Sequence, residues 1–123
     1  MACDSELFRV DSFTVDGEEW AIEDGSATIE GAAGFEREAA LAANGPDFTT
    51  RKRVARVIKA KLLFTGSRNP DTISQICEAQ IVMTNLHTGR RVRAGKCSFM
   101  SMGEVGTGAV DIQFAVLTAL QWL

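Results

Sequence analysis

The chain has few of the residues on which catalysis usually depends. Among 123 residues there are one histidine, three cysteines and no tyrosine. General acid–base chemistry relies most often on histidine, and the lone His87 follows Leu86 in an expected hairpin turn, where a solvent-exposed position explains it best. The sequence motifs of serine hydrolases, zinc proteases, P-loop NTPases and dinucleotide-binding enzymes are absent. We therefore predict that the protein is not an enzyme and uses no cofactor and no metal.

Long apolar runs and an excess of positive charge are also missing. No uninterrupted apolar stretch approaches the roughly 20 residues that a helix needs to cross a bilayer. The beginning of the chain carries Asp4 and Glu6 instead of the basic start of a signal peptide. The net charge of −3 argues against a free-standing nucleic-acid binder, which normally shows a basic face. We expect a protein made in the cytoplasm, without a membrane partner, whose residues 1–7 form an N-terminal arm.

Cysteine is scarce, and its spacing excludes a zinc site. Cys3, Cys77 and Cys97 lie far apart in the sequence and have no neighbouring histidine. We expect Cys77 and Cys97 to be buried as small apolar side chains. An odd number of cysteines would permit a disulfide between subunits in an oxidising exterior, and Cys3 in the polar N-terminal arm is its first candidate. The alternative is a plain reduced thiol.

What the chain does contain is the alternation of apolar and polar residues that is typical of strands. With 46% hydrophobic and 24% charged residues, it can form one domain, over 1–123, with its own core. Period-two patterns predict strands over 53–65, 79–86 and 109–116. A change of parity at Gly95 and Lys96 predicts a β-bulge in the strand between the last two.

Turn and cap signals complete the expected fold. Asp16 and Gly17 predict a tight hairpin, because both residues adopt positive φ at little cost. Asp71 is expected to cap a helix that ends at Cys77, which is too short to cover both faces of a parallel sheet. We predict a mainly β fold, an antiparallel β-sandwich or barrel of about seven strands, with one short flanking α-helix, unpaired sheet edges and a long protruding arm.

The arm is the segment 35–53, which holds few large apolar side chains. Ala39–Ala43 could form a helical turn ended by Asn44 and Gly45, or the segment could be a long open hairpin with stems over 35–38 and 49–52. Either form buries little against its own domain, so we predict that it packs on a neighbouring subunit. The residues assigned to this inter-subunit contact are Phe35, Glu36, Arg37, Glu38, Leu41, Asn44, Gly45, Pro46, Phe48, Arg51 and Arg53.

Two further groups of residues suggest contacts. The basic run that contains Arg51 and Arg53 is better explained by a solvated strand face or by salt bridges between subunits than by nucleic-acid binding. The chain ends on the apolar residues Leu120, Trp122 and Leu123, which must cover either their own core or a partner.

The order of these features resembles the tail tube proteins of contractile-tailed bacteriophages, particularly the Mu-like kind. The resemblance covers about residues 13–116. It rests on the hairpin Val15, Asp16 and Gly17, on Phe35 to Glu38 opening an arm with Asn44, Gly45 and Pro46, on the long strand from Val54 to Phe64, on the short helix, on the strand from Ile81 to Leu86, and on the closing strand after Gly106 and Gly108.

The resemblance implies a structural virion protein that forms homo-hexameric rings stacked into a hollow tail tube. It also implies an arm that reaches across subunits and rings, and inner sheets that join into one barrel without open edges. The implied partners are the tail sheath protein outside, and the tape-measure protein and non-specifically held double-stranded DNA in the lumen. The alternatives are the tube of a type VI secretion system or another contractile injection device, and a small ligand-binding β-barrel.

Overall fold

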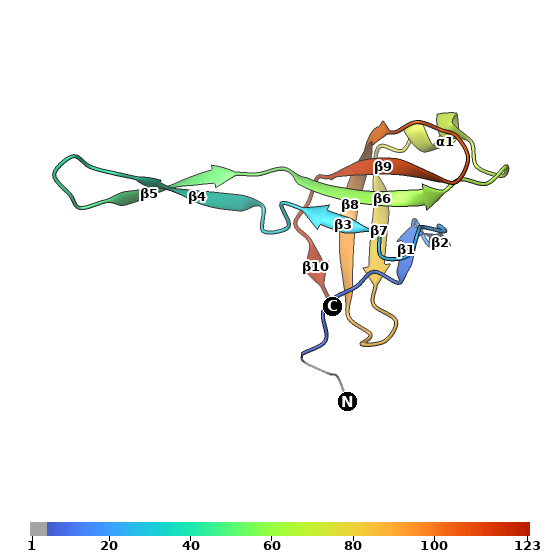
Figure 1. Cartoon of the computed structure of the whole chain (residues 1–123), viewed down its shortest axis with the longest axis horizontal. Helices are drawn as coiled ribbons and strands as arrows, with labels where there is room; N and C mark the ends of the chain where they lie inside the picture. The colour runs from blue at the N-terminus through green and yellow to red at the C-terminus, as the bar shows by residue number, and fades with distance from the viewer. Residues whose placement is uncertain (1–4) are drawn as a thin grey trace.

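The structure, a computed structural model, describes residues 5–123 and shows a β body from which one hairpin projects (Figure 1). All the strand pairs are antiparallel. The elements in chain order are β1 (Ser12–Val15), β2 (Glu18–Glu19), β3 (Thr28–Glu30), β4 (Phe35–Ala40), β5 (Phe48–Arg53), β6 (Arg56–Leu63), α1 (Pro70–Ser74), β7 (Ala79–Thr84), β8 (Arg91–Met102), β9 (Ala109–Val116) and β10 (Gln121–Trp122).

The body is one sheet of strand order β2-β1-β7-β8-β9-β6-β3, with β10 added beside β8. The long strand β8 belongs to both halves of this sheet: its beginning pairs with β7 and β10, and its end pairs with β9. Figure 1 shows β7 and β8 running down the picture while β6 and β9 run across it. The sheet therefore bends at β8 so that its two halves enclose the core, as in an orthogonal β-sandwich.

A β-bulge in β8 contributes to this bend. Ile81 lies opposite Ala94, but Ala79 lies opposite Cys97, so β8 has one extra residue between these pairs. This confirms the bulge predicted at Gly95 and Lys96. Bulges increase local twist and bend the strand that carries them.

Hydrogen bonds from the segment after β2 draw the two ends of the sheet together. The Leu63 amide donates to the Ala21 carbonyl at 2.9 Å, and the Glu23 amide donates to the Lys61 carbonyl at 2.8 Å. The chain thus leaves β1 and β2 and pairs with the outer edge of β6. The predicted mainly β, antiparallel sandwich or barrel with one short helix is confirmed.

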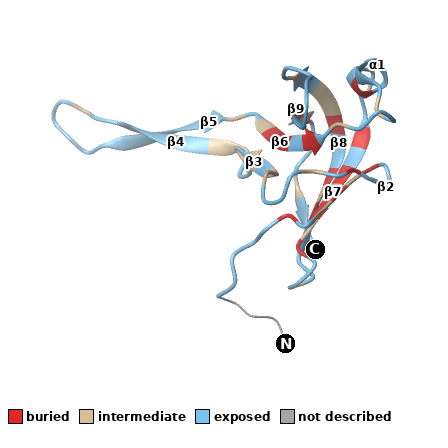
Figure 2. Cartoon of the chain, turned by 45° about the vertical axis from the view of Figure 1, so that its right-hand side comes forward, coloured by how far each residue is buried: buried red, intermediate tan, exposed pale blue. Residues whose placement is uncertain are grey.

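The core follows from the alternation in the strands. Ile58, Ala60 and Leu62 of β6 face Val110, Ile112 and Phe114 of β9, and all six are at most 3% exposed. The rings of Phe13, Trp20 and Phe114 fill the interior, with centroids 6.4 Å and 6.0 Å from Trp20. Figure 2 shows the buried residues confined to the body and the hairpin β4–β5 exposed along most of its length.

The turn at Asp16 and Gly17 is confirmed, with φ of 51° and 83°.

Two other local predictions were wrong in detail. The strand expected over 53–65 is interrupted at Val54 and Ala55, where the chain passes from the hairpin into the body and β5 gives way to β6.

The helix is also shorter than expected and ends at Ser74. Asn69, and not Asp71, caps it by accepting a hydrogen bond from the Asp71 amide at 2.9 Å. Pro70 occupies the first helical position, where its fixed φ suits the helix, so the capping residue is the one before it.

The cysteines differ from each other in burial. Cys97 is buried, and desolvation by burial raises the pKa of its thiol to about 11. Cys77 is exposed just beyond α1, so the expectation that it is a buried small residue was wrong. The helix ends one turn earlier than predicted, and Cys77 lies outside the face that carries Ile73 into the core. Cys3 lies outside the described residues.

Candidate functional site

The projecting arm is a regular two-stranded hairpin. β4 and β5 pair from Phe35 opposite Arg53 to Ala40 opposite Phe48. The open-hairpin alternative is therefore confirmed, and the helical turn over Ala39–Ala43 is wrong. Six residues of extended strand span roughly 20 Å, and Figure 1 shows the hairpin directed away from the body.

The two faces of the arm differ in chemistry. Residues opposite each other in an antiparallel pair share a face, so one face carries Phe35, Arg37, Arg51 and Arg53, with Ala39 and Thr49 beyond them. We call this the basic face. The guanidinium groups of Arg37 and Arg51 lie 5.2 Å and 4.4 Å from the Phe35 ring centroid. The basic face thus presents two guanidinium groups at one aromatic ring, with Arg53 opposite Phe35 in the strand register.

The opposite face carries Glu36, Glu38 and Lys52 near the body and becomes apolar toward the far end of the arm. Phe48 is 61% exposed and Leu41, the first loop residue, is 77% exposed. We call the end formed by residues 40–48 the arm tip; it includes the predicted Asn44, Gly45 and Pro46. The tip exposes large apolar side chains that its own domain does not cover, which is typical of an interaction surface.

Two glycines that the sequence analysis did not single out set the base of the arm. Gly31 and Gly34 have φ of 67° and 79°, and the Gly34 amide donates to the Gly31 carbonyl at 2.9 Å. A Cβ atom on Gly31 would collide with the backbone carbonyl oxygen of Ala55. Only glycine combines this conformation with so close an approach. The signal in the sequence was the pair of glycines immediately before the arm.

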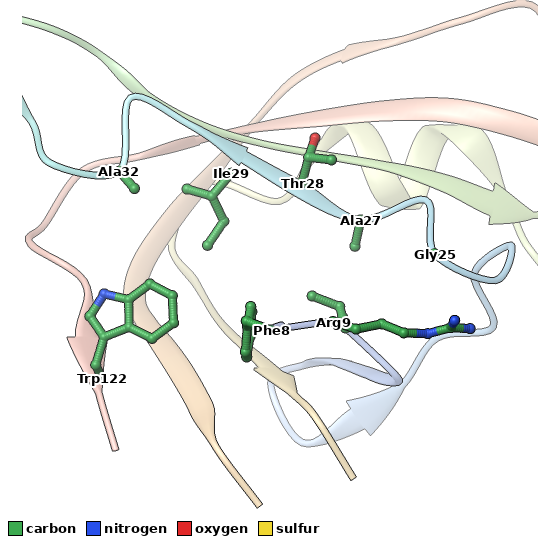
Figure 3. A pocket seen from close by; sticks show the side chains of 9 residues that line it. Phe8, Arg9, Gly25, Ala27, Thr28, Ile29, Ala32 and Trp122 are labelled. Carbon is green, nitrogen blue, oxygen red and sulfur yellow. The ribbon is translucent and has the colours of Figure 1, made fainter. Parts of the chain in front are cut away.

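A second surface lies beside the arm base, where the two ends of the described chain meet. The rings of Phe8 and Trp122 are 5.3 Å apart in an edge-on arrangement, and β10 pairs with the first part of β8. Their side chains border an apolar groove of about 450 Å³ (Figure 3). Its apolar members are Phe8, Val10, Ala27, Ile29, Ala32 and Trp122.

The C-terminal residues therefore cover part of their own domain and leave the rest open. Leu120 is half-buried against the core, whereas Trp122 and Leu123 remain 43% and 55% exposed. Arg90 lies over the Trp122 ring at 5.0 Å from its centroid. The contact of Leu120 with its own core is thus observed, while a contact of Trp122 and Leu123 with a partner stays a prediction.

Outside the arm and the groove, the structure places the lone histidine at the surface. His87 is exposed, and its Nδ1 lies 3.2 Å from the Glu6 carboxylate. Across residues 5–123 no group of three or more histidine, cysteine or acidic side chains is placed to hold a metal ion. In the same range, no helix reaches the length and hydropathy required to cross a membrane.

Sequence comparison finds no relative: no protein-family model and no curated protein matches the chain. The fold, in contrast, matches solved structures. A chain in the extended-state sheath/tube terminator of the extracellular contractile injection system PVC has a TM-score of 0.65 at 10% identity, covering 96% of this chain and 95% of that one.

Two other structures give the same result. A chain in the extended-state PVC sheath-tube complex has a TM-score of 0.63 at 11% identity, covering 96% of this chain and 90% of that one. A chain in the tube-terminating cap of the anti-feeding prophage has a TM-score of 0.62 at 12% identity, covering 97% and 93%. At such coverage the match includes most of the arm. The resemblance inferred from the sequence is thus confirmed for the fold of contractile-injection tube assemblies, while the Mu-like phage kind is not singled out.

Proposed function

We propose that this chain is a structural subunit of the tube of a contractile injection machine, and that it acts by assembling with copies of itself. The observation that carries the proposal is a fold shared over nearly the whole chain with components of such machines, arm included. The arm supports it independently, because a hairpin whose strands are exposed almost throughout buries little surface against its own domain.

The assembly that fits best is a homo-hexameric ring, stacked into a hollow tube inside a contractile sheath. Each subunit would contribute its arm and its free sheet edges, so that many repeated weak contacts hold the tube together. In a phage the tube would belong to the virion tail, be made in the host cytoplasm, enclose the tape-measure protein and conduct double-stranded DNA. Another contractile injection device, such as a type VI system, would use the same architecture for a different cargo.

The body favours this structural role over a ligand-binding barrel. Phe13, Trp20 and Phe114 occupy the interior between the two halves of the sheet. Side chains of this size leave the core packed, whereas a ligand-binding barrel keeps its interior open. The protein would therefore act through its surfaces.

A tube terminator is a second candidate, because two of the three structures described above are of a terminator or a cap. A tube subunit adds to rings of its own kind without limit, whereas a terminator forms one ring and stops. The length of the particles formed by the purified protein separates the two.

An inter-subunit disulfide remains a proposal. Cys97 is buried in the core and its raised pKa keeps it protonated. Cys77 is exposed, so within residues 5–123 it is the cysteine that a neighbour could reach.

Deletion of Ala39–Phe48 tests the proposed function. The strands of the arm pack on nothing in the body, so the shortened chain should keep its circular dichroism spectrum and its cooperative thermal unfolding. It should sediment as a monomer, while the intact chain should form rings or tubes in negative-stain micrographs. Long tubes formed by the shortened chain would contradict the role of the arm, and an intact chain that stays monomeric at high concentration would contradict the function.

A further inference from the structure

The chain exposes two apolar surfaces that nothing in its own domain covers: the arm tip and the groove beside the arm base. We propose that the arm tip of one copy inserts into the groove between Phe8, Ile29 and Trp122 of the next copy. This inference rests on the proposed self-assembly and specifies where the arm binds.

The two surfaces match in size and character. The tip offers Leu41, the first residue after β4, and Phe48, the first residue of β5, and both side chains are more than half exposed. The groove, at about 450 Å³, is within the size range of sites that hold small organic ligands. It is therefore large enough for one leucine and one phenylalanine side chain. Figure 3 shows the rings of Phe8 and Trp122 and the side chain of Ile29 bordering the same space.

The backbone beside the groove is also open. Thr28 and Ile29 of β3 line the groove, and β3 is the last strand on its side of the sheet. An edge strand has unpaired amide and carbonyl groups that can pair with an extended segment of another chain. A hairpin strand leading to an inserted tip is such a segment.

The charges around the two surfaces are complementary. The tip and the residues next to it carry Glu38 and Asp47 and no basic residue between them. The groove is bordered by Arg9, whose guanidinium is already paired with Asp11 and Asp24, and Arg90 lies over the Trp122 ring, so Arg90 is the cation that would attract the acidic tip. Opposite charges at the rim of an apolar contact favour the correct partner and orientation.

The geometry requires the contact to be between copies. The groove includes Ala32, three residues before the arm begins, whereas the tip lies at the far end, roughly 20 Å away along the strands. A contact from the tip of one copy to the base of the next uses different surfaces on each partner. Such a heterologous contact repeats, and it yields either a closed ring or a helical filament.

The test is a disulfide engineered across the proposed contact, in the full chain with Cys3→Ser and Cys77→Ser, so that the buried Cys97 is the one native cysteine kept. Leu41→Cys combined with Ala32→Cys places one thiol on the tip and one in the groove. Both positions are exposed, so the substitutions should leave the fold intact, as circular dichroism can verify. Mild oxidation of the assembled protein should give a ladder of covalent multimers on a non-reducing gel.

The matched control combines Leu41→Cys with Ser67→Cys, an exposed position in the loop before α1. It should give several-fold less cross-linked product than the tip–groove pair. Equal ladders from both pairs, or no ladder from the tip–groove pair in particles that electron microscopy shows to be assembled, would overturn the groove as the binding site and leave the proposed function standing. Absence of any assembly in the parent protein would overturn the proposed function itself.

Discussion

At the scale of single residues, β9 shows how sharply adjacent positions can differ. Ile112 is 1% exposed and lies opposite Ala60, whereas Gln113 is half-buried on the outer face opposite Lys59. Ile112→Lys would place a charge among apolar side chains with no partner, which costs several kcal/mol or forces the chain to open. We expect it to lower the free energy of unfolding by at least about 4 kcal/mol, measured by urea denaturation at neutral pH.

Gln113→Lys is the control for this change. It adds the same side chain one position away, where the amine reaches water but lies opposite Lys59, and we expect a loss of no more than about 1 kcal/mol. Similar losses for the two variants would mean that the assignment of the inner and outer faces of β9 is wrong.

At the scale of elements, the arm depends on the turn from which it starts. Gly31 and Gly25 both have positive φ, at 67° and 71°, but only Gly31 is close to other backbone atoms. An alanine at either position would pay about 1 kcal/mol for the left-handed conformation. At Gly31 its Cβ would also collide with the Ala55 carbonyl oxygen in the break between β5 and β6. Gly31→Ala should therefore lower stability more than Gly25→Ala and displace the arm.

Two measurements separate the variants. Urea denaturation should show the larger loss of unfolding free energy for Gly31→Ala, and negative-stain microscopy should show tubes for Gly25→Ala but few or none for Gly31→Ala. If both variants assemble like the parent protein, the base of the arm does not need the geometry described for Gly31.

At the scale of the whole molecule, the arm and the body carry opposite charge. Residues 35–53 contain four basic and three acidic side chains, a net charge of +1, so the remainder of a chain of net charge −3 carries −4. An arm that binds a neighbour's body is therefore attracted to it at low salt. At 1 M salt the screening length falls to about 3 Å, so the association constant should decrease between about 0.05 M and about 1 M NaCl.

Sedimentation velocity at several salt concentrations measures this change. The melting temperature of the arm-deleted monomer, measured at the same salt concentrations, shows how far salt changes the stability of the fold itself. Assembly that is unchanged or stronger at high salt would show that the opposite net charges of the arm and the body do not drive association.

The sequence by itself determined what depends on neighbours along the chain. Alternation in β9, the turn at Asp16 and Gly17 and the bulge near Gly95 were predicted because side-chain direction in a strand and the φ preferences of turn residues are local properties. The arm was predicted for a related reason. A stretch that lacks large apolar residues cannot bury enough surface to hold itself against the body.

The tertiary structure alone decided what depends on residues that are distant in sequence. Phe8 and Trp122 meet because β10 pairs with β8 and the N-terminal segment crosses beside it, and no local pattern encodes that meeting. The break at Val54 follows from the point where the hairpin leaves the body, and the need for glycine at position 31 follows from the Ala55 carbonyl. Local periodicity fixes which face of each strand is apolar, but only the packing of the strands against one another decides which apolar surfaces remain uncovered.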